Sequence, residues 1–198
     1  DLYDPGKGMF RLTPESDSQT YSHEILPLLD GKKIDRVFLT HAHLDHIGNL
    51  CSLSRAGLFH KDTLIWASPQ TNDIVRITGL DDLRKKDCEF GIFDYMDVIC
   101  RLRDIPHPGE NIIDGDPMSM DPNGHMAGST SFTIKTPAGR NALIVGDTCR
   151  HNQAIVLGGV TPAWPIDEIW TVDLTYPSSQ KVDVSYDDKR LELMLAVE

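Results

Sequence analysis

Short apolar segments of strand length recur along the chain, separated by residues that favour turns. Each is rich in β-branched, aromatic or leucine residues and too short for a typical helix. Gly31 precedes the first segment, and the turn-forming residues 137–139 (PAG) lie between the third and the fourth. We therefore expect strands at residues 35–39, 63–67, 131–135, 142–145 and 168–174.

Other segments space their apolar residues as a helix does. Apolar positions between residues 47 and 59 recur at close to helical spacing, and Pro69 suits the first turn of a helix that we expect to run to Ile77. Shorter helices are expected at residues 24–29 and 95–101. Strands and helices interleave without a repeat or a linker, so we expect an α/β (α+β) fold in a single domain, residues 1–198.

The composition limits the partners. The formal net charge is −11, from 30 acidic and 19 basic residues, which repels duplex nucleic acid unless bound cations offset it. A hydrophobic share of 40% is enough for a core, and no segment approaches the roughly 20 apolar residues of a membrane helix. We therefore expect a small anionic substrate, and neither duplex nucleic acid nor a membrane as a partner.

The cysteines indicate a reducing compartment. They lie far apart and form no CxxC pair, and a chain of this length does not need disulfides to build a core. We interpret all four as free thiols of a cytoplasmic protein: Cys51, Cys88, Cys100 and Cys149.

The richest chemistry lies in residues 40–48, which read THAHLDHIG and follow an apolar run. His41 and His43 point to the same side of an extended segment, so both can bind one ion, while Asp45 and His46 can reach a second position. Nitrogen and carboxylate donors suit zinc, manganese or iron. A single histidine here could be an ordinary residue, but four ligand-type residues within six positions favour a metal site, with the spacing of two metals.

Two later residues have the chemistry to join this cluster. His125 lies in residues 123–129, which read NGHMAGS, and Asp147 follows the apolar residues 143–145 and Gly146. Glycine after an apolar strand allows a close backbone approach, and a carboxylate at that strand end could bridge two cations. Alone, His125 could be a loop residue and Asp147 a turn or cap residue.

The order of these motifs resembles that of the metallo-β-lactamase superfamily of binuclear hydrolases, over roughly residues 2–177. The resemblance implies a four-layer αββα sandwich and two divalent metal ions, zinc first, with manganese or iron as alternatives. It also implies the ligands. His41, His43 and His125 would hold one metal, Asp45 and His46 would hold the other, and Asp147 would lie between the two.

Asp4 resembles the aspartate of the family's Asp-x-Gly segment, which implies a place behind the metals, beside their ligands. The family usually has further strands before this segment and one more histidine ligand after the position of Asp147. We therefore expect a chain incomplete at both ends, in which the second metal binds weakly because affinity depends on the number of ligands.

Within the superfamily, the local sequence resembles class II cyclic-nucleotide phosphodiesterases. Residues 41–47 read HAHLDHI, Ser54 follows, and residues 129–134 with 143–147 are similar to that group's strand pair. The resemblance implies hydrolysis of 3′,5′-cyclic nucleotides to 5′-nucleotides by a hydroxide held between two metals and oriented by Asp45. Three positions differ from that group's signature: Asn49, Ser52 and Arg55.

Other functions stay open. The motif order is shared with tRNA 3′-processing endonucleases, and thioester or lactam hydrolysis is chemically reasonable. A metal-poor sensor is a further alternative. Asp173 lies where the nuclease group has an acidic residue, with strand capping as its alternative, and His107 could line the pocket. The leading interpretation is a phosphodiesterase with a cyclic nucleotide as its small anionic substrate, and a homodimer stays open.

Overall fold

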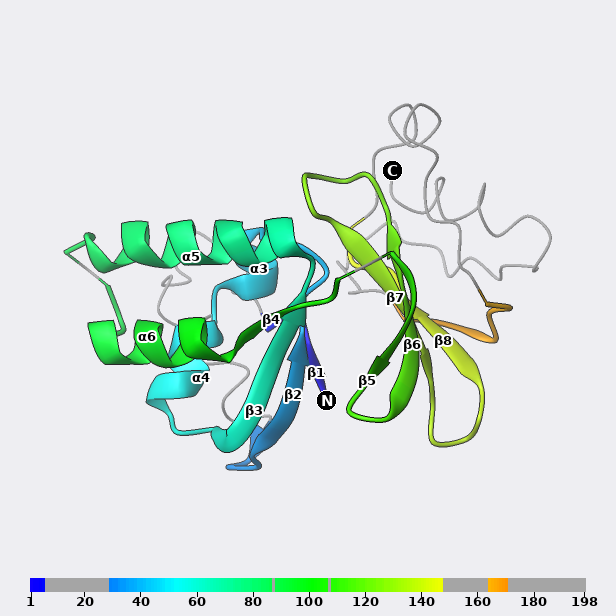
Figure 1. Ribbon diagram of the computed structural model, residues 1–198. Helices are drawn as coiled ribbons and strands as arrows, with labels where there is room; N and C mark the ends of the chain where they lie inside the picture. Colours follow the sequence, from blue (N-terminus) through cyan, green and yellow to red (C-terminus); the bar gives the residue numbers. More distant parts are fainter. Residues whose placement is uncertain (6–28, 87, 107, 148–163, 171–198) are drawn as a thin grey trace, which may run out of the picture. The chain divides into compact units, whose positions relative to one another are not determined.

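The computed structural model describes residues 1–5, 29–86, 88–106, 108–147 and 164–170 (Figure 1). Backbone contacts divide the chain into two compact units, residues 1–104 and 105–198, called unit 1 and unit 2 below. The assignment of one domain to residues 1–198 remains a prediction. No helix in the described ranges is long and apolar enough to cross a membrane.

Unit 1 is built on a parallel sheet in the order β1-β2-β3-β4. Parallel neighbours need crossover connections, and helices supply them here. Figure 1 shows the helices of unit 1 packed along this sheet. The strands are β1 (Leu2–Tyr3), β2 (Ile34–Phe38), β3 (Phe59–Ala67) and β4 (Leu102–Asp104), and the helices are α3 (Leu44–Ile47), α4 (Leu50–Arg55), α5 (Pro69–Leu83) and α6 (Ile92–Arg101).

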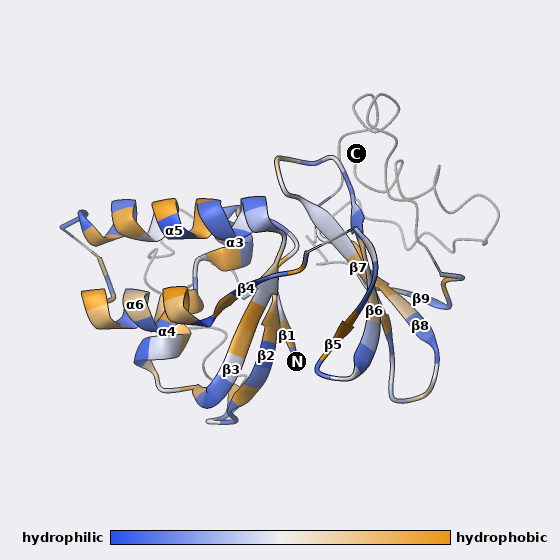
Figure 2. Ribbon diagram, viewed as in Figure 1, coloured by the Kyte–Doolittle hydropathy of each residue, from blue (hydrophilic) through white to orange (hydrophobic). Residues whose placement is uncertain are grey.

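The core of unit 1 lies between this sheet and its helices. Val37, Ile65, Leu53 and Val98, from β2, β3, α4 and α6, are almost completely buried. In Figure 2 the hydrophobic part of β3 follows a hydrophilic start, which is the segment of polar residues after Phe59. The parts of β2 and β3 next to the ligand run are therefore buried in the core, which gives that run a rigid base.

The expected elements of unit 1 exist with different bounds. The strand expected at 63–67 begins at Phe59, the helix expected at 69–77 ends at Leu83, and the helix expected at 95–101 begins at Ile92. β4 was not expected, because residues 102–104 follow α6 without a turn residue. The helix expected at 24–29 lies, except for its last residue, outside the described residues.

α6 is fixed to its neighbours by side chains. The hydroxyl of Tyr95 donates to the carbonyl oxygen of Arg76 on α5 at 3.0 Å. Asp97 accepts hydrogen bonds from Ser54 Oγ on α4, at 2.7 Å, and from Arg101 Nε, at 3.0 Å. Burial raises the pKa of Asp97, but the hydrogen bonds from Arg101 and Ser54 lower it by a larger amount. The pKa therefore lies below its ordinary value.

Unit 2 contains a five-stranded sheet in the order β5-β6-β7-β8-β9. All pairs are antiparallel except β8 with β9, which are parallel. The strands expected at 131–135, 142–145 and 168–174 are present, the last of them described to residue 170. The bounds are β5 (Gly109–Ile113), β6 (Asp116–Pro122), β7 (Thr130–Lys135), β8 (Asn141–Ile144) and β9 (Glu168–Trp170).

The hairpin of β5 and β6 was not expected from the sequence. Its two-residue turn is Asp114-Gly115, with φ of 53° and 92°, between the paired residues Ile113 and Asp116. Positive φ at both central residues is typical of the type I′ turn, which Asp-Gly favours. The fold class is thus the expected α/β class, with one parallel and one largely antiparallel sheet. Three cysteines are free thiols as expected, and Cys149 lies outside the described residues.

Candidate metal centre

The ligand run of unit 1 begins where β2 ends. β2 ends at Phe38, Leu39 N still donates to the carbonyl oxygen of Trp66 on β3 at 3.0 Å, and α3 begins at Leu44 after the N-cap residue His43. Ends of parallel strands are common sites for ligands, because the chain leaves the sheet there and side chains of successive loops converge. The sequence therefore presents four ligand-type side chains from one strand end and the helix that follows it.

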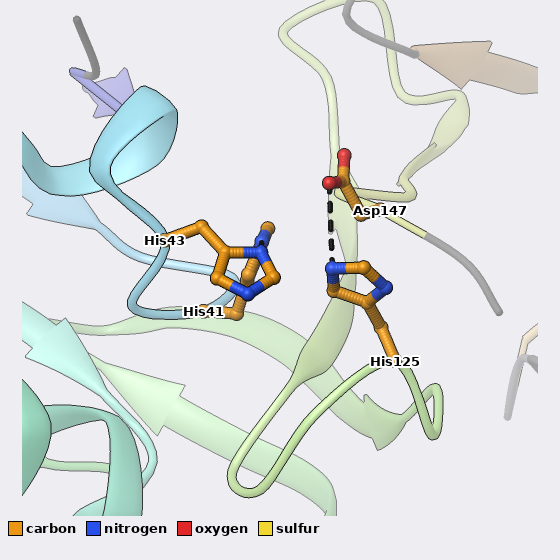
Figure 3. Close-up of side chains that lie close together, drawn as sticks. All are labelled: His41, His43, His125 and Asp147. Carbon is orange, nitrogen blue, oxygen red and sulfur yellow. Dashed lines mark hydrogen bonds and ion pairs between the residues drawn. The ribbon is translucent and has the colours of Figure 1, made fainter. Parts of the chain in front are cut away.

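His41 and His43 share one side of the run, as expected from their spacing. Nε2 of His41 lies 3.0 Å from Nδ1 of His43, and the two rings meet edge to face with centroids 4.7 Å apart. His41 is completely buried. Figure 3 draws the two rings, which approach each other with their nitrogen atoms. Two imidazoles in this arrangement can direct lone pairs to one cation.

Asp4 anchors the ligand run from behind. Its Oδ1 accepts a hydrogen bond from Thr40 N at 2.7 Å, and its Oδ2 accepts one from Thr40 Oγ1 at 2.7 Å. The same Oδ2 lies 3.0 Å from Nδ1 of the buried His46. Asp4 has a φ of 45°, a left-handed conformation that aspartate tolerates better than most residues. The carboxylate that the resemblance puts behind the metals thus contacts one ligand candidate directly.

The contacts of Thr40 indicate which nitrogen of His41 carries the proton. The single hydroxyl proton of Thr40 is donated to Asp4, so Thr40 Oγ1 can only accept from Nδ1 of His41, which lies 3.0 Å away. Nδ1 of His46 also lies 3.0 Å from a carboxylate oxygen, but without the geometry of a hydrogen bond, so this contact does not assign the proton of His46. His41 then carries the proton on Nδ1 and presents a lone pair on Nε2. This is the usual arrangement of a metal-binding histidine with an outer carboxylate or hydroxyl partner.

Asp45 shows that these residues fit a cation. Its Oδ1 is buried, and among the residues that the structure describes none forms a hydrogen bond with this atom. Its Oδ2 lies 3.8 Å from Nε2 of His46. A buried carboxylate oxygen without a partner is costly, and a metal ion in contact with it removes that cost. Nitrogen and oxygen donors together match zinc, manganese or iron.

The second group of ligand candidates belongs to unit 2. His125 lies in the loop between β6 and β7, and Asp147 follows β8, after Gly146 with a φ of 63°. Nε2 of His125 lies 3.5 Å from Oδ2 of Asp147, the contact that the dashed line marks in Figure 3. Both side chains are partly buried. A turn that only glycine adopts easily thus brings a carboxylate from the end of β8 to the histidine of the preceding hairpin.

Several predicted residues are not tested by these observations. The assignment of the six ligands to two metals remains a prediction, because each unit presents only its own part of the set. His107 and Asp173 lie outside the described residues. The sequence alone did not predict a role for Thr40 or for Asn123, a buried residue in the loop of His125. The signal for Thr40 is its place next to His41, whereas Asn123 gives no signal before its contacts are known.

Comparison with known proteins finds a partial match to a family and a shared fold. Residues 4–61 match the Metallo-beta-lactamase superfamily. Ribonuclease TTHA0252 of Thermus thermophilus is 28% identical over 148 residues, which are 74% of this chain and 33% of that protein. Transcription termination factor FttA of Methanothermobacter thermautotrophicus is 23% identical over 190 residues, 91% of this chain and 29% of that protein. The chain thus spans about a third of the length of these curated relatives.

Solved structures share the fold at low sequence identity. A HARLDQ-motif metallo-β-lactamase from Cronobacter sakazakii superimposes with a TM-score of 0.51 and 14% identity, covering 77% of this chain and 65% of that one. At this identity the likeness concerns the fold and carries no information on the substrate.

Proposed function

We propose that this chain, which has the metallo-β-lactamase fold, is a metal-dependent phosphodiesterase that hydrolyses RNA. The observation that carries the proposal is the ligand run of unit 1. There Thr40, which is hydrogen-bonded to Asp4, keeps the proton of the buried His41 on Nδ1, and Asp45 presents a buried oxygen without a partner among the described residues. The nitrogen lone pair that this leaves on Nε2 of His41 and this carboxylate oxygen are oriented to bind a cation.

The proposed site combines candidates from both units. In this proposal His41, His43 and His125 hold one ion. Asp45 and His46 hold a second ion, and Asp147 lies between the two. Support comes from the donor atoms within each unit, which are close enough to share an ion. Zinc is the proposed metal, since histidine nitrogen and carboxylate oxygen are among its preferred donors.

Two bound cations would supply positive charge at the phosphoryl oxygens and would lower the pKa of a water molecule toward neutrality. The chain's own residues prepare the site for this. Thr40, which is hydrogen-bonded to Asp4, holds His41 with Nε2 deprotonated, and Asp4 lies beside Nδ1 of His46. Asp45 has one oxygen available to a cation and a second that can accept a hydrogen bond from water and so orient it.

RNA is the proposed substrate because of the relatives. Of the two curated relatives above, one is named a ribonuclease, and this favours the nuclease alternative over the cyclic-nucleotide interpretation. Part of the sequence signal for the latter also has a structural explanation, since Ser54 donates a hydrogen bond to Asp97 on α6. The net charge of −11 opposes an RNA substrate, and bound divalent cations would offset it where the phosphate lies.

The test compares substrates on one zinc-loaded preparation of the chain. The substrates are a 5′-labelled single-stranded RNA, DNA of the same sequence, cyclic AMP, cyclic GMP, a thioester and a β-lactam. We expect cleavage of the RNA, loss of cleavage in Asp45→Ala, and unchanged cleavage in the matched control Asp62→Ala, whose side chain is 82% exposed.

Other results would replace the proposal. Turnover of cyclic AMP or cyclic GMP without RNA cleavage would restore the cyclic-nucleotide interpretation, and turnover of the thioester or the lactam alone would change the reaction class. Fewer than one metal ion per chain, together with no hydrolysis of any substrate, would support a sensor instead of an enzyme.

A further inference from the structure

Asn123 lies at the junction of the two segments of unit 2 that carry ligand candidates. It follows β6 directly, only 1% of it is exposed, and its own N–H donates to the carbonyl oxygen of Ser129 at 3.2 Å, which closes the loop of His125. Its side chain then reaches out of this loop to the end of β8. A single amide therefore contacts both the loop of His125 and the strand end that precedes Asp147.

All four hydrogen-bonding positions of the amide are used. Oδ1 accepts from His125 N at 3.2 Å and from Ser129 Oγ at 2.6 Å. Nδ2 donates to Ser131 Oγ at 3.3 Å and to the carbonyl oxygen of Val145 at 3.2 Å. The orientation of the amide follows from chemistry, because a backbone N–H can only donate and a backbone carbonyl can only accept. A reversed amide would face both groups with the wrong atom.

The contacts on the β8 side are reinforced by a second residue. Ser131 Oγ, on β7, donates to the same carbonyl oxygen of Val145 at 2.6 Å. Val145 is two residues before Asp147, and the amide of His125 is held by the other end of the Asn123 side chain. A short, fully bonded bridge therefore joins the backbone at one ligand candidate to the backbone just before the other. Such a bridge limits the separation of the two side chains, which is 3.5 Å between His125 Nε2 and Asp147 Oδ2.

We propose that Asn123 is a positioning residue that fixes His125 and Asp147 relative to each other and thereby raises the metal affinity of the chain. This inference rests on the proposed function, since it takes both residues as metal ligands. Asn123 would not touch the ion. Its effect is that of an outer partner, whose loss typically lowers metal affinity by about 10- to 100-fold.

A purely structural role predicts a different result. If Asn123 only stabilised the hairpin loop, its replacement would lower the melting temperature and leave the metal affinity unchanged. The matched control is Asn72→Ala in unit 1. Asn72 is also completely buried, and it donates to Arg103 O at 2.9 Å and to Asp104 Oδ1 at 2.7 Å, neither of which is a ligand candidate.

The experiment measures Zn²⁺ affinity by competition with a chromophoric chelator, and the absorption spectrum of bound Co²⁺, on the full chain. We expect Asn123→Ala to raise the dissociation constant by about 10- to 100-fold and to change the Co²⁺ spectrum. Asn72→Ala should lose thermal stability and keep both metal readouts. Ser131→Ala, a milder change on the Val145 side, should give a smaller rise in the dissociation constant.

Each outcome decides one of two questions. If the wild-type chain binds neither ion, the proposed function falls and this inference falls with it. If the wild type binds metal and Asn123→Ala binds it equally well with the same Co²⁺ spectrum, the inference alone is wrong. Should Asn123→Ala fail to fold, Ser131→Ala decides, and a wild-type dissociation constant in that variant would overturn the positioning role.

Discussion

Replacing Thr40 with valine removes one hydroxyl group and keeps the shape of the side chain. In the folded chain that hydroxyl donates to Asp4 and accepts from Nδ1 of His41. Asp4 retains its contacts with Thr40 N and with His46 in the variant, because neither involves the hydroxyl. The change therefore acts mainly on His41, whose Nδ1–H loses its acceptor in a completely buried position.

The magnitude follows from that lost acceptor. A buried donor without a partner costs about 1–3 kcal/mol. The imidazole can avoid this cost by moving its proton to Nε2, but a protonated Nε2 has no lone pair for a metal. The free energy of metal binding is then weakened by the same amount. Because about 1.4 kcal/mol corresponds to a factor of ten, we expect the metal affinity to fall by about 5- to 150-fold.

The assay is the competition titration with Zn²⁺, together with urea denaturation of the metal-free chain. Thr40→Ser keeps the hydroxyl and should bind almost as the wild type does. Thr63→Val is the matched control, because Thr63 is equally buried and donates to Ile34 O at 2.5 Å in the same unit. It should lose stability and keep metal affinity. Equal metal affinities of Thr40→Val and Thr63→Val would refute the reasoning.

Three further predictions concern stability. Gly79→Ala should lower the free energy of unfolding by about 1–3 kcal/mol, although alanine normally favours a helix, because its methyl group would lie 2.7 Å from the ring of Tyr95. A urea midpoint above that of the wild type would contradict this. The pKa of Asp97 is lowered in the folded chain, since hydrogen bonds from Arg101 and Ser54 outweigh burial. Its contribution is therefore present above about pH 4 and is lost as the pH falls through the folded-state pKa. Asp97→Asn should be less stable than the wild type at pH 7, with a smaller difference in acid, and a constant difference across this range would argue against it. Removal of metal by a chelator should lower the melting temperature, because an ion at a hundred times its dissociation constant stabilises by about 2.7 kcal/mol. An unchanged melting temperature in a chain that binds metal would speak against linkage to folding.

The sequence predicted β2 and its ligand run well because local and tertiary signals agree there. An apolar strand followed directly by four ligand-type residues needs no distant contact to be recognised. The hairpin of β5 and β6 carried a local signal, the Asp114-Gly115 turn, but Pro117 and Pro122 in β6 argue against a strand. α5 extends past its expected end and includes Gly79, a residue that normally weakens a helix. The ring of Tyr95 on α6 packs closely at this glycine, and this tertiary contact is not visible in the local sequence.

In the candidate site too, local signals were predicted and tertiary contacts were not. Donor types and spacing identify ligand candidates from the sequence, since those depend on chemistry. The outer residues depend on contacts between segments far apart in the chain, such as Thr40 with Asp4, and Asn123 with Val145. Nothing in a single sequence links such positions, so their roles emerge only from the folded arrangement.

One carboxylate in unit 1 serves two imidazoles. Asp4 contacts His46 directly and His41 through Thr40, and the proposed site assigns these two histidines to different ions. Binding at the two positions is then thermodynamically coupled. An ion that immobilises Asp4 through one histidine also lowers the entropic cost of ordering the other histidine. The chain should therefore take up its two ions cooperatively, and a substitution at either ring should weaken both steps of the binding isotherm.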